Sequence, residues 1–497
     1  MNKPGLRKEQ GPSNGEGRET LPGLTRRNFL KCSAGAVAGV CLGCLLGGCG
    51  GGSGGSNPPD ATFPAVVFSD IHFNPFYDPT LFPALKAADP SQWAAIFQSS
   101  SITAPSTWGY YGNTRFDSNY PLLALALSAV KQNLGTSPLV IYTGDILGHL
   151  FSQTFYVLDG STDAAAMRAF TDDTVSFVMQ QVRSAVGNIP VLFALGNTDS
   201  YTGQGPDSTF LSNAAQLYYD QFLNGIADQQ TFLSDFTSGG YYSASIPGLN
   251  LVVIGINTYE CSPSFNGAAS AAVNAQLAWL NTALASAQAA GEKVWLLMHL
   301  APGADESTTA QSVDSNGHIS NPTMFWDAGY QASFFQILSG YPDVVTFTLG
   351  AHTHNDEYRI IQPGQALDIP GGISPLFGNN PAFKVYAFDG NALAATDYAS
   401  FNLDPSAASP QFNNYYTFST AYGVRGLLNN SLAELYPLLK TNGAKQGFYR
   451  AAYPSGHSYS TPAGFEVDPI TDQTWPVYWA GIKNMDARSL IDAVNSY

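Results

Sequence analysis

Five short apolar segments, each followed by residues that can bind a metal ion, constrain the fold of this chain more than any other feature. They are residues 65–69 before Asp70 and His72, 139–143 before Gly144 and Asp145, 191–195 before Gly196 and Asn197, 294–298 before His299, and 344–349 before His352 and His354. Continuous apolar runs of this length are typical of strands buried on both faces of a helix-covered sheet. Residues 121–133 and 271–290 repeat apolar residues three and four positions apart, which predicts helices between the strands. This alternation predicts an α/β fold built from βαβ units.

The polar side chains after these segments form one candidate site. Loops at the carboxyl ends of parallel strands meet in one crevice of such a sheet, so we expect these side chains to lie together. They are Asp70, His72, Asp145, Asn197, His299, His352 and His354. Mixed carboxylate, amide and imidazole ligands suit zinc, iron or manganese better than magnesium or calcium. Two such ions about 3.5–4 Å apart clamp phosphoryl oxygens and acidify a water molecule, and Asp145 is our candidate for the carboxylate that spans both ions.

The same residues, in this order, resemble the signature of the calcineurin-like metallophosphoesterases. That signature is Asp-x-His, Gly-Asp, Gly-Asn-His-(Asp/Glu), a lone His and Gly-x-His-x-His, and its counterparts here are 70–72, 144–145, 196–199, 299 and 351–354. Over residues 64–390 the chain is similar to the acid sphingomyelinase-like phosphodiesterases, through further strings at 144–149, 276–280, 299–303, 352–358 and 380–386.

The resemblance implies a layered α/β/β/α metallophosphoesterase sandwich with a small helical C-terminal subdomain. It also implies two divalent metal ions, with zinc favoured and iron or manganese as the other options. One ion would be held by Asp70, His72, Asp145 and His354, and the other by Asp145, Asn197, His299 and His352.

Thr198 departs from the family pattern, which has a histidine after the motif asparagine. That histidine contacts the phosphate or helps to protonate the leaving group, and threonine cannot act as a general acid near neutral pH. His149, four residues after Asp145, stands where the sphingomyelinase-like enzymes have a second active-site histidine, so it is our candidate proton donor. Thr198 and Asn257 are candidate substrate-binding residues, although Asn257 could equally be a turn residue after the apolar run 251–256.

The first 60 residues indicate export rather than a part of the fold. Residues 25–31, Thr-Arg-Arg-Asn-Phe-Leu-Lys, and the uncharged run after them resemble a twin-arginine signal. Leu46-Gly47-Gly48-Cys49 resembles a lipobox with Cys49 as the lipidation site, and cleavage by an ordinary signal peptidase is the alternative. We predict a signal peptide over 1–48, a Gly/Ser/Pro tether over 49–60, a metallophosphoesterase domain over 61–395 and a mainly helical accessory subdomain over 396–497.

Together these features predict an exported dinuclear-metal phosphodiesterase, periplasmic or at the cell surface, that uses a metal-bridging hydroxide as its nucleophile. A phosphomonoesterase or nucleotide hydrolase on the same site is one alternative, and a metal-binding protein with catalysis impaired by Thr198 is another. The formal net charge of −16 argues against nucleic-acid binding, which needs Lys and Arg against phosphates. The expected partners are a phosphate-ester substrate, such as a phospholipid or nucleotide, and a membrane reached through a lipid on Cys49.

Overall fold

The computed structural model of the chain describes residues 62–105, 117–263, 270–456 and 469–497. The predicted signal peptide, the tether and Cys49 lie outside the described residues. All elements below belong to the compact unit Ser56–Tyr497. Within the described ranges, no helix is both long and apolar enough to cross a membrane.

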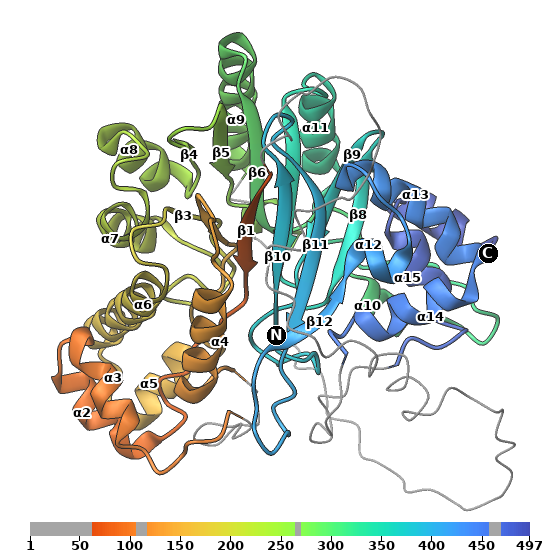
Figure 1. Ribbon diagram of the computed structural model, residues 1–497. Helices are drawn as coiled ribbons and strands as arrows, with labels where there is room; N and C mark the ends of the chain where they lie inside the picture. The colour runs from red at the N-terminus through yellow and green to blue at the C-terminus, as the bar shows by residue number, and fades with distance from the viewer. Residues whose placement is uncertain (1–61, 106–116, 264–269, 457–468) are drawn as a thin grey trace, which may run out of the picture. The chain divides into compact units, whose positions relative to one another are not determined.

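The first sheet has six strands in the order β12-β11-β10-β1-β2-β3 (Figure 1). Its strands are β1 (Thr62–Phe68), β2 (Val140–Tyr142), β3 (Val191–Phe193), β10 (Ala382–Asp389), β11 (Ala394–Asn402) and β12 (Asn413–Thr417). β1, β2 and β3 are parallel, and β10 runs antiparallel to β1. The strands that precede Asp70, Asp145 and Asn197 therefore end side by side.

The second sheet also has six strands, in the order β4-β5-β6-β7-β9-β8. They are β4 (Tyr242–Ser245), β5 (Leu251–Gly255), β6 (Lys293–Leu300), β7 (Val345–Ala351), β8 (Glu357–Gln362) and β9 (Gln365–Ile369). β5, β6 and β7 are parallel. The prediction that His299 follows a strand is wrong, because β6 continues to Leu300 and so includes His299. The pairing of β6 with β7 is irregular between Leu297 and Leu300.

The two sheets pack face to face through aromatic side chains. The Trp295 ring of β6 stacks on the Phe388 ring of β10, with centroids 4.0 Å apart. Trp295 and Leu297 belong to this inter-sheet core, whereas Val294 and Leu296 belong to a second core shared with α9 (Ser270–Ala290) and α11 (Ala328–Ser339). Successive strand residues point to opposite faces, so β6 has a sheet on one side and helices on the other.

Helices cover the outer sides of both sheets (Figure 1). Side chains of α4 and α6 belong to the core of the first sheet, which confirms the layered α/β/β/α fold. The helices of the first half are α2 (Phe82–Ala87), α3 (Trp93–Gln98), α4 (Tyr120–Gln132), α5 (Phe151–Asp159), α6 (Ala164–Val186), α7 (Ser208–Tyr218) and α8 (Gln229–Gly239). Single turns of other helix types occupy Pro79–Leu81, Pro90–Gln92, Tyr219–Leu223 and Tyr259–Cys261.

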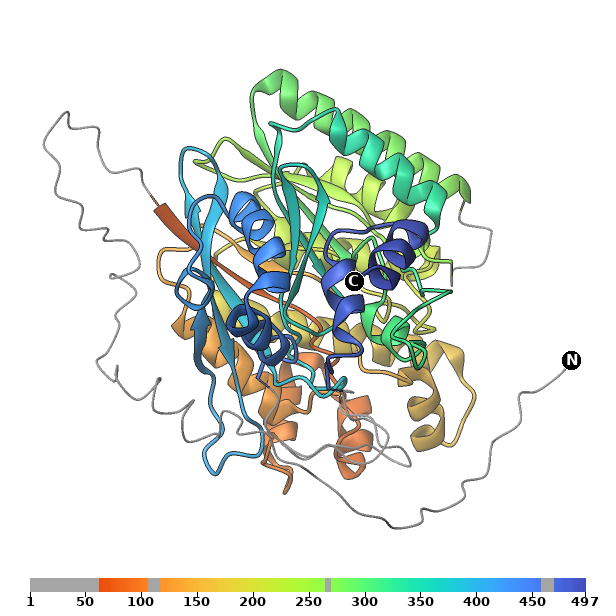
Figure 2. The ribbon, with the colours of Figure 1, turned by 90° about the vertical axis from the view of Figure 1, so that its right-hand side faces the viewer.

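The C-terminal part contains several short helices, drawn in blue beside the sheets in Figure 2. After α10 (Glu306–Ala310) and α11, they are α12 (Phe418–Tyr422), α13 (Leu428–Thr441), α14 (Gly443–Ala452), α15 (Trp475–Gly481) and α16 (Ala487–Asn495). α13 packs against β8 and β9 of the second sheet. β11 crosses the predicted boundary at residue 395, and the division into two domains there stays a prediction.

Acidic residues at helix starts account for part of the negative charge of the chain. The Asp163 side chain accepts hydrogen bonds from the first-turn N–H groups of Ala165 and Ala166, and Asp207 does the same for α7. A carboxylate here satisfies N–H groups that have no partner within the helix and interacts favourably with the helix dipole. These carboxylates are structural caps and need no basic partner.

A buried lysine joins the two sheets close to the histidine-bearing loop after β7. Lys384 of β10 is fully buried, and its Nζ lies 2.8 Å from Asp356 Oδ1 and 2.9 Å from Asp368 Oδ2. The Tyr416 hydroxyl donates to Asp356 Oδ2 at 2.7 Å. Since buried charges are tolerated only when paired and hydrogen-bonded, this network holds Asp356, two residues after His354, in one position.

Candidate metal centre

The ends of β1 and β2 place three predicted ligands next to one another. The strand pairing continues beyond both strands, with the Asp70 N–H donating to Gly144 O at 3.0 Å and the His72 N–H donating to Asp145 O at 2.9 Å. The φ angles of Asp70, His72 and Asp145 are 51°, 43° and 63°, in the left-handed region that side chains rarely adopt. Such conformations persist only where the surrounding structure stabilises them, and they concentrate at functional sites.

His352 and His354, after β7 of the second sheet, have the same unusual backbone conformation, with φ angles of 78° and 60°. Among the described residues, eight other than glycine have positive φ, and five of these are predicted metal ligands. The chain therefore bends sharply where each of these ligands leaves its strand, on both sheets. The structure places these side chains close together, as expected, but between strands of two sheets rather than along one.

Asp145 lies at the centre of the cluster. Its Oδ2 is 3.2 Å from His72 Nε2 and 3.1 Å from His299 Nε2. His72 Nε2 is in turn 3.1 Å from His354 Nε2, and His354 Nε2 is 3.5 Å from Asp70 Oδ1. One oxygen of Asp145 thus faces ligand nitrogens from both sheets.

The remaining ligands lie around His299. Its Nε2 is 3.2 Å from Asn197 Oδ1, and the His299 and His352 ring centroids are 5.3 Å apart. The ligand atoms of Asp70, His72 and His354 lie within 4.8 Å of one another, as do those of Asp145, His299 and His352. All seven predicted ligands are therefore brought together, in two adjacent groups that meet at Asp145.

Backbone carbonyl groups hold three of the imidazole rings. The Nδ1 atoms lie 3.1 Å from Leu147 O for His72, 2.8 Å from Thr143 O for His299 and 2.9 Å from Ser374 O for His354. An Nδ1–H that donates to a carbonyl leaves Nε2 as the nitrogen with a free lone pair. The lone pairs of His72 and His354 would then face each other at 3.1 Å, which requires a positive charge between them, either a metal ion or a proton on one of the two rings.

The buried charges also fit a cation. Both carboxylate oxygens of Asp70 are buried without a hydrogen-bond partner in the described part of the chain. Burial raises the pKa of Asp70 to about 6 and lowers the pKa of His352 to about 3, so the imidazole of His352 is neutral. Against the effect of burial, the Asp145 carboxylate raises the pKa of His72 and of His299 to about 9. The cluster thus holds positive charge beside Asp145, in the place where a metal ion would supply it to neutral imidazoles. The clustered His and Asp side chains therefore suggest a metal site.

Two glycines allow the ends of β2 and β3 to approach each other. A Cβ atom on Gly196 would lie 2.0 Å from Asp145 Oδ1, and one on Gly144, whose φ is 101°, would lie 2.5 Å from Gly196 N. Contacts this short do not occur between real atoms, so any side chain here would displace Asp145. Glycine is therefore sterically required at position 144, before Asp145, and at position 196, before Asn197.

Thr198 contacts Asp145. Its N–H and its hydroxyl donate to Asp145 Oδ1, at 2.8 and 2.9 Å. The neighbouring Asp199 accepts hydrogen bonds from the backbone N–H groups of Asp145, Ile146 and Gly196, at 3.0, 2.7 and 2.8 Å. Thr198 therefore directs one oxygen of Asp145 away from the ligand nitrogens and leaves Oδ2 to face them, and its role toward substrate stays a prediction.

The contact between Thr198 and Asp145 leads to a direct test. Because the Thr198→Val variant keeps the shape but loses the hydroxyl bond, we expect its affinity for divalent metal to fall about 10- to 100-fold, as is usual when a group supporting a ligand is removed. Thr198→Ser restores a hydroxyl and should retain most of the affinity. Metal titration of both variants by calorimetry checks this, and equal affinities for Val and Ser would contradict the supporting role.

His149 lies beside the ligand groups and is held by Asp117. Its Nδ1 is 2.8 Å from Asp117 Oδ1, and its backbone N–H donates to Asp117 Oδ2 at 2.6 Å. The His149 and His72 rings stack with centroids 4.3 Å apart. Burial alone would raise the pKa of Asp117, but the adjacent His149 lowers it below the usual range, so Asp117 is a carboxylate that holds the His149 ring. Asp117 was not predicted.

Asn257 follows β5 and is fully buried. Gln276 holds its backbone, with the Asn257 N–H donating to Gln276 Oε1 at 2.8 Å and Gln276 Nε2 donating to Asn257 O at 2.9 Å. Neither polar atom of the Asn257 side chain has a hydrogen-bond partner among the described residues. A buried amide without partners is unfavourable, and the contact of Asn257 with substrate stays a prediction.

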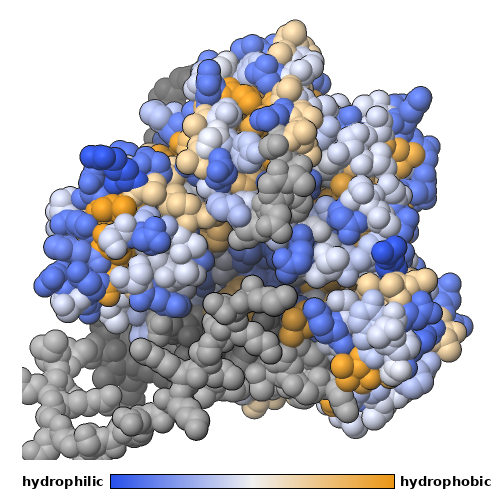
Figure 3. All heavy atoms as spheres, turned by 180° about the vertical axis from the view of Figure 1, so that it is seen from behind, coloured by the Kyte–Doolittle hydropathy of each residue, from blue (hydrophilic) through white to orange (hydrophobic). Residues whose placement is uncertain are grey.

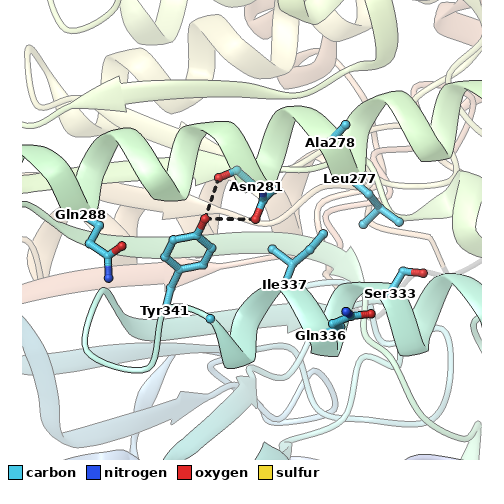
Figure 4. A pocket seen from close by; sticks show the side chains of 9 residues that line it. Leu277, Ala278, Asn281, Gln288, Ser333, Gln336, Ile337 and Tyr341 are labelled. Atoms are coloured by element: carbon cyan, nitrogen blue, oxygen red, sulfur yellow. Dashed lines mark hydrogen bonds between the residues drawn. The ribbon is translucent and has the colours of Figure 1, made fainter.

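A groove of about 570 Å³ runs between α9 and α11 (Figure 4). The Tyr341 hydroxyl closes part of it by donating to Asn281 O and Oδ1, at 3.2 and 3.0 Å. Its lining contains no His, Asp, Glu or Cys side chain. The groove therefore lacks the side chains that usually bind zinc, iron or manganese, and the candidate site is the cluster around Asp145.

Comparison with known proteins gives relatives but no family model that matches. Sphingomyelinase phosphodiesterase D of Dictyostelium discoideum is 25% identical over 400 residues, which cover 74% of this chain and 83% of the relative. The human acid sphingomyelinase-like phosphodiesterase 3b is 25% identical over 384 residues, with coverage of 72% and 75%. The human cyclic GMP-AMP phosphodiesterase SMPDL3A is 24% identical over 396 residues, with coverage of 76% and 79%. The ordered ligand motifs, the two-sheet sandwich and these relatives together make the chain similar to the metallophosphoesterases, and in particular to the acid sphingomyelinase-like proteins.

Proposed function

We propose that this protein is an exported phosphodiesterase that works with two divalent metal ions. The observation that carries the proposal is the pair of ligand groups that meet at Asp145 Oδ2, buried except for the half-buried Asn197 and His352. Metal-dependent phosphoric ester hydrolysis agrees with the phosphodiesterase names of the relatives. Zinc is our preferred metal, since four imidazoles with few carboxylates suit it well, and iron or manganese are the other options.

The ligand sets follow from the two groups. Asp70, His72 and His354 would hold one ion and Asn197, His299 and His352 the other, with Asp145 between them. When bound, such a pair polarises the phosphoryl oxygens and lowers the pKa of the attacking water. The carbonyl groups bonded to Nδ1 keep the rings oriented toward the ions, and Thr198 does the same for Asp145.

His149 would supply the proton that the leaving alkoxide needs. Asp117 accepts from Nδ1–H and stabilises the protonated ring, which leaves Nε2–H free to donate toward the substrate. His149 is also partly exposed, with 17% of its side chain accessible, whereas the metal ligand His72 beside it is buried. A proton donor must reach both substrate and solvent, because it is reprotonated after each turnover.

The relatives suggest two substrate classes. Their names refer to sphingomyelin and to cyclic GMP-AMP, so a phospholipid headgroup ester and a nucleotide diester are both candidates for this chain.

Initial rates with bis(p-nitrophenyl) phosphate and p-nitrophenyl phosphate test the proposed phosphodiesterase activity directly. We expect a clear preference for the diester, whereas a preference for the monoester would favour the phosphomonoesterase alternative.

A metal-binding protein without turnover is a second candidate, favoured by the presence of Thr198 where the family has a histidine. It would bind metal at the cluster yet hydrolyse neither ester.

Export with lipid attachment at Cys49 is proposed on the sequence alone. Labelling of the full chain with radioactive palmitate in its host, with Cys49→Ser as the control, tests the lipid, and equal labelling of both would contradict it.

A further inference from the structure

Residues 371–380 form a loop that lies directly against the candidate metal centre. The Ile373 N–H donates to Ser69 O at 3.0 Å, and the Ser374 N–H donates to Asp70 O at 2.8 Å. Ser374 O in turn lies 2.9 Å from the Nδ1 atom of His354. The loop is thus attached both to the end of β1 and to a predicted ligand on the second sheet.

Phe377 is the only exposed residue of this ten-residue loop, with 46% of its surface accessible, while the other nine are buried. It is at the tip of a turn closed by the Gly378 N–H, which donates to Pro375 O at 3.0 Å. The Phe377 ring meets the His354 ring edge-on, with centroids 4.8 Å apart. A phenyl ring is therefore presented to solvent at the edge of the metal centre.

The loop holds this ring in place. Asn379 Nδ2 donates to Gly372 O at 3.2 Å and to Ser374 O at 3.0 Å, across the base of the turn. A Cβ on Gly372 would lie 3.0 Å from both Asp70 Cβ and His354 Cγ, so the loop is packed tightly onto the ligands. A ring on such a support loses little conformational entropy when it binds a ligand.

Single exposed apolar residues are common and carry no meaning by themselves. Within the described ranges the large exposed hydrophobic residues are Val157, Phe377, Leu427 and Tyr497. On the face drawn in Figure 3, hydrophobic residues form small separate spots among hydrophilic ones. Phe377 differs from the other three because its ring contacts His354, a predicted metal ligand.

We propose that Phe377 is a binding platform for a planar aromatic group carried by the phosphate ester, such as a nucleobase or a phenyl ring. The inference rests on the proposed function, since the phosphate must bind at the metals beside it. The residues next to Phe377 in the loop are buried, so this loop contributes a single exposed ring to the platform. A single ring face suits a stacked aromatic ring better than a long acyl chain, which needs a larger apolar surface.

Calorimetry with two phosphonates that cannot be hydrolysed tests the platform on the full zinc-loaded chain. Phenylphosphonate and methylphosphonate share the metal-binding group and differ only in the organic group. We expect the wild-type protein to bind phenylphosphonate about 5- to 30-fold more tightly. Phe377→Ala should abolish that preference and leave the methylphosphonate affinity within about two-fold of the wild-type value. Phe377→Trp should retain the preference. Leu427→Ala is the control and should change neither affinity.

Each other outcome has a definite meaning. Equal affinity of the wild-type protein for the two phosphonates would overturn the platform and leave the proposed function standing. A loss of both affinities in Phe377→Ala would also overturn it, because the ring would then only support His354. If neither phosphonate binds to the metal-loaded wild-type chain, the proposed function itself fails.

Discussion

Replacing Asp145 by asparagine is expected to remove both metal ions and lower kcat/KM by at least about 1,000-fold, or roughly 4 kcal/mol of transition-state stabilisation. Asp145 Oδ1 accepts both bonds from Thr198, and the amide oxygen of asparagine can keep them. The amide nitrogen would then occupy the place of Oδ2, between His72 Nε2 and His299 Nε2. Since an amide nitrogen has no lone pair available for a metal, neither ligand group would be complete.

Metal content per chain and the rate of diester hydrolysis measure this effect, and thermal unfolding shows whether the fold persists. Asp492→Asn is the matched control, because Asp492 is exposed on α16. It should keep the metal content and the rate of the wild-type protein. An Asp145→Asn variant that binds metal and turns over like the wild type would contradict the role of Asp145.

The second large effect is expected for His149→Asn. Asparagine can place its side-chain N–H where Nδ1 bonds to Asp117, but it cannot donate a proton to a leaving group. For a diester with an alkyl leaving group we expect kcat to fall about 10²- to 10⁴-fold. For a diester that releases p-nitrophenolate, which needs little protonation, the loss should stay below about 10-fold.

The comparison between the two leaving groups separates proton donation from a structural role. A structural defect would lower both rates equally, and that result would contradict the assignment of His149. His318→Asn is the matched control, because His318 is an exposed histidine in a loop. It should change neither rate.

The fold and the ligand set were predictable because both are local properties of the sequence. Each ligand stands at or just after an apolar strand, and a run such as 191–195 identifies its strand without knowledge of distant contacts. Helices 121–133 and 271–290 were likewise found by periodicity and correspond to α4 and α9. What periodicity does not show is which strands share a sheet, so the division of the ligand strands between two sheets was missed.

The supporting residues were not predictable, because their contacts join distant parts of the chain. Asp117 holds His149 from 32 positions away, in a segment with no motif of its own. Thr198 was interpreted as the absence of a histidine, and only the structure shows that its hydroxyl bonds to Asp145. Phe377 gave no sequence signal, since one apolar residue in a loop resembles any other before its exposure is known.

The central claim is that the cluster around Asp145 holds two divalent metal ions that hydrolysis requires. The most direct test measures the metal content of the purified protein by mass spectrometry together with its rate of bis(p-nitrophenyl) phosphate hydrolysis, before chelation, after it, and after metal is restored. We predict about two ions per chain, a rate that falls as the ions are removed, and recovery when they return. Turnover that persists in the metal-free protein, or a purified chain that takes up no metal, would contradict the account.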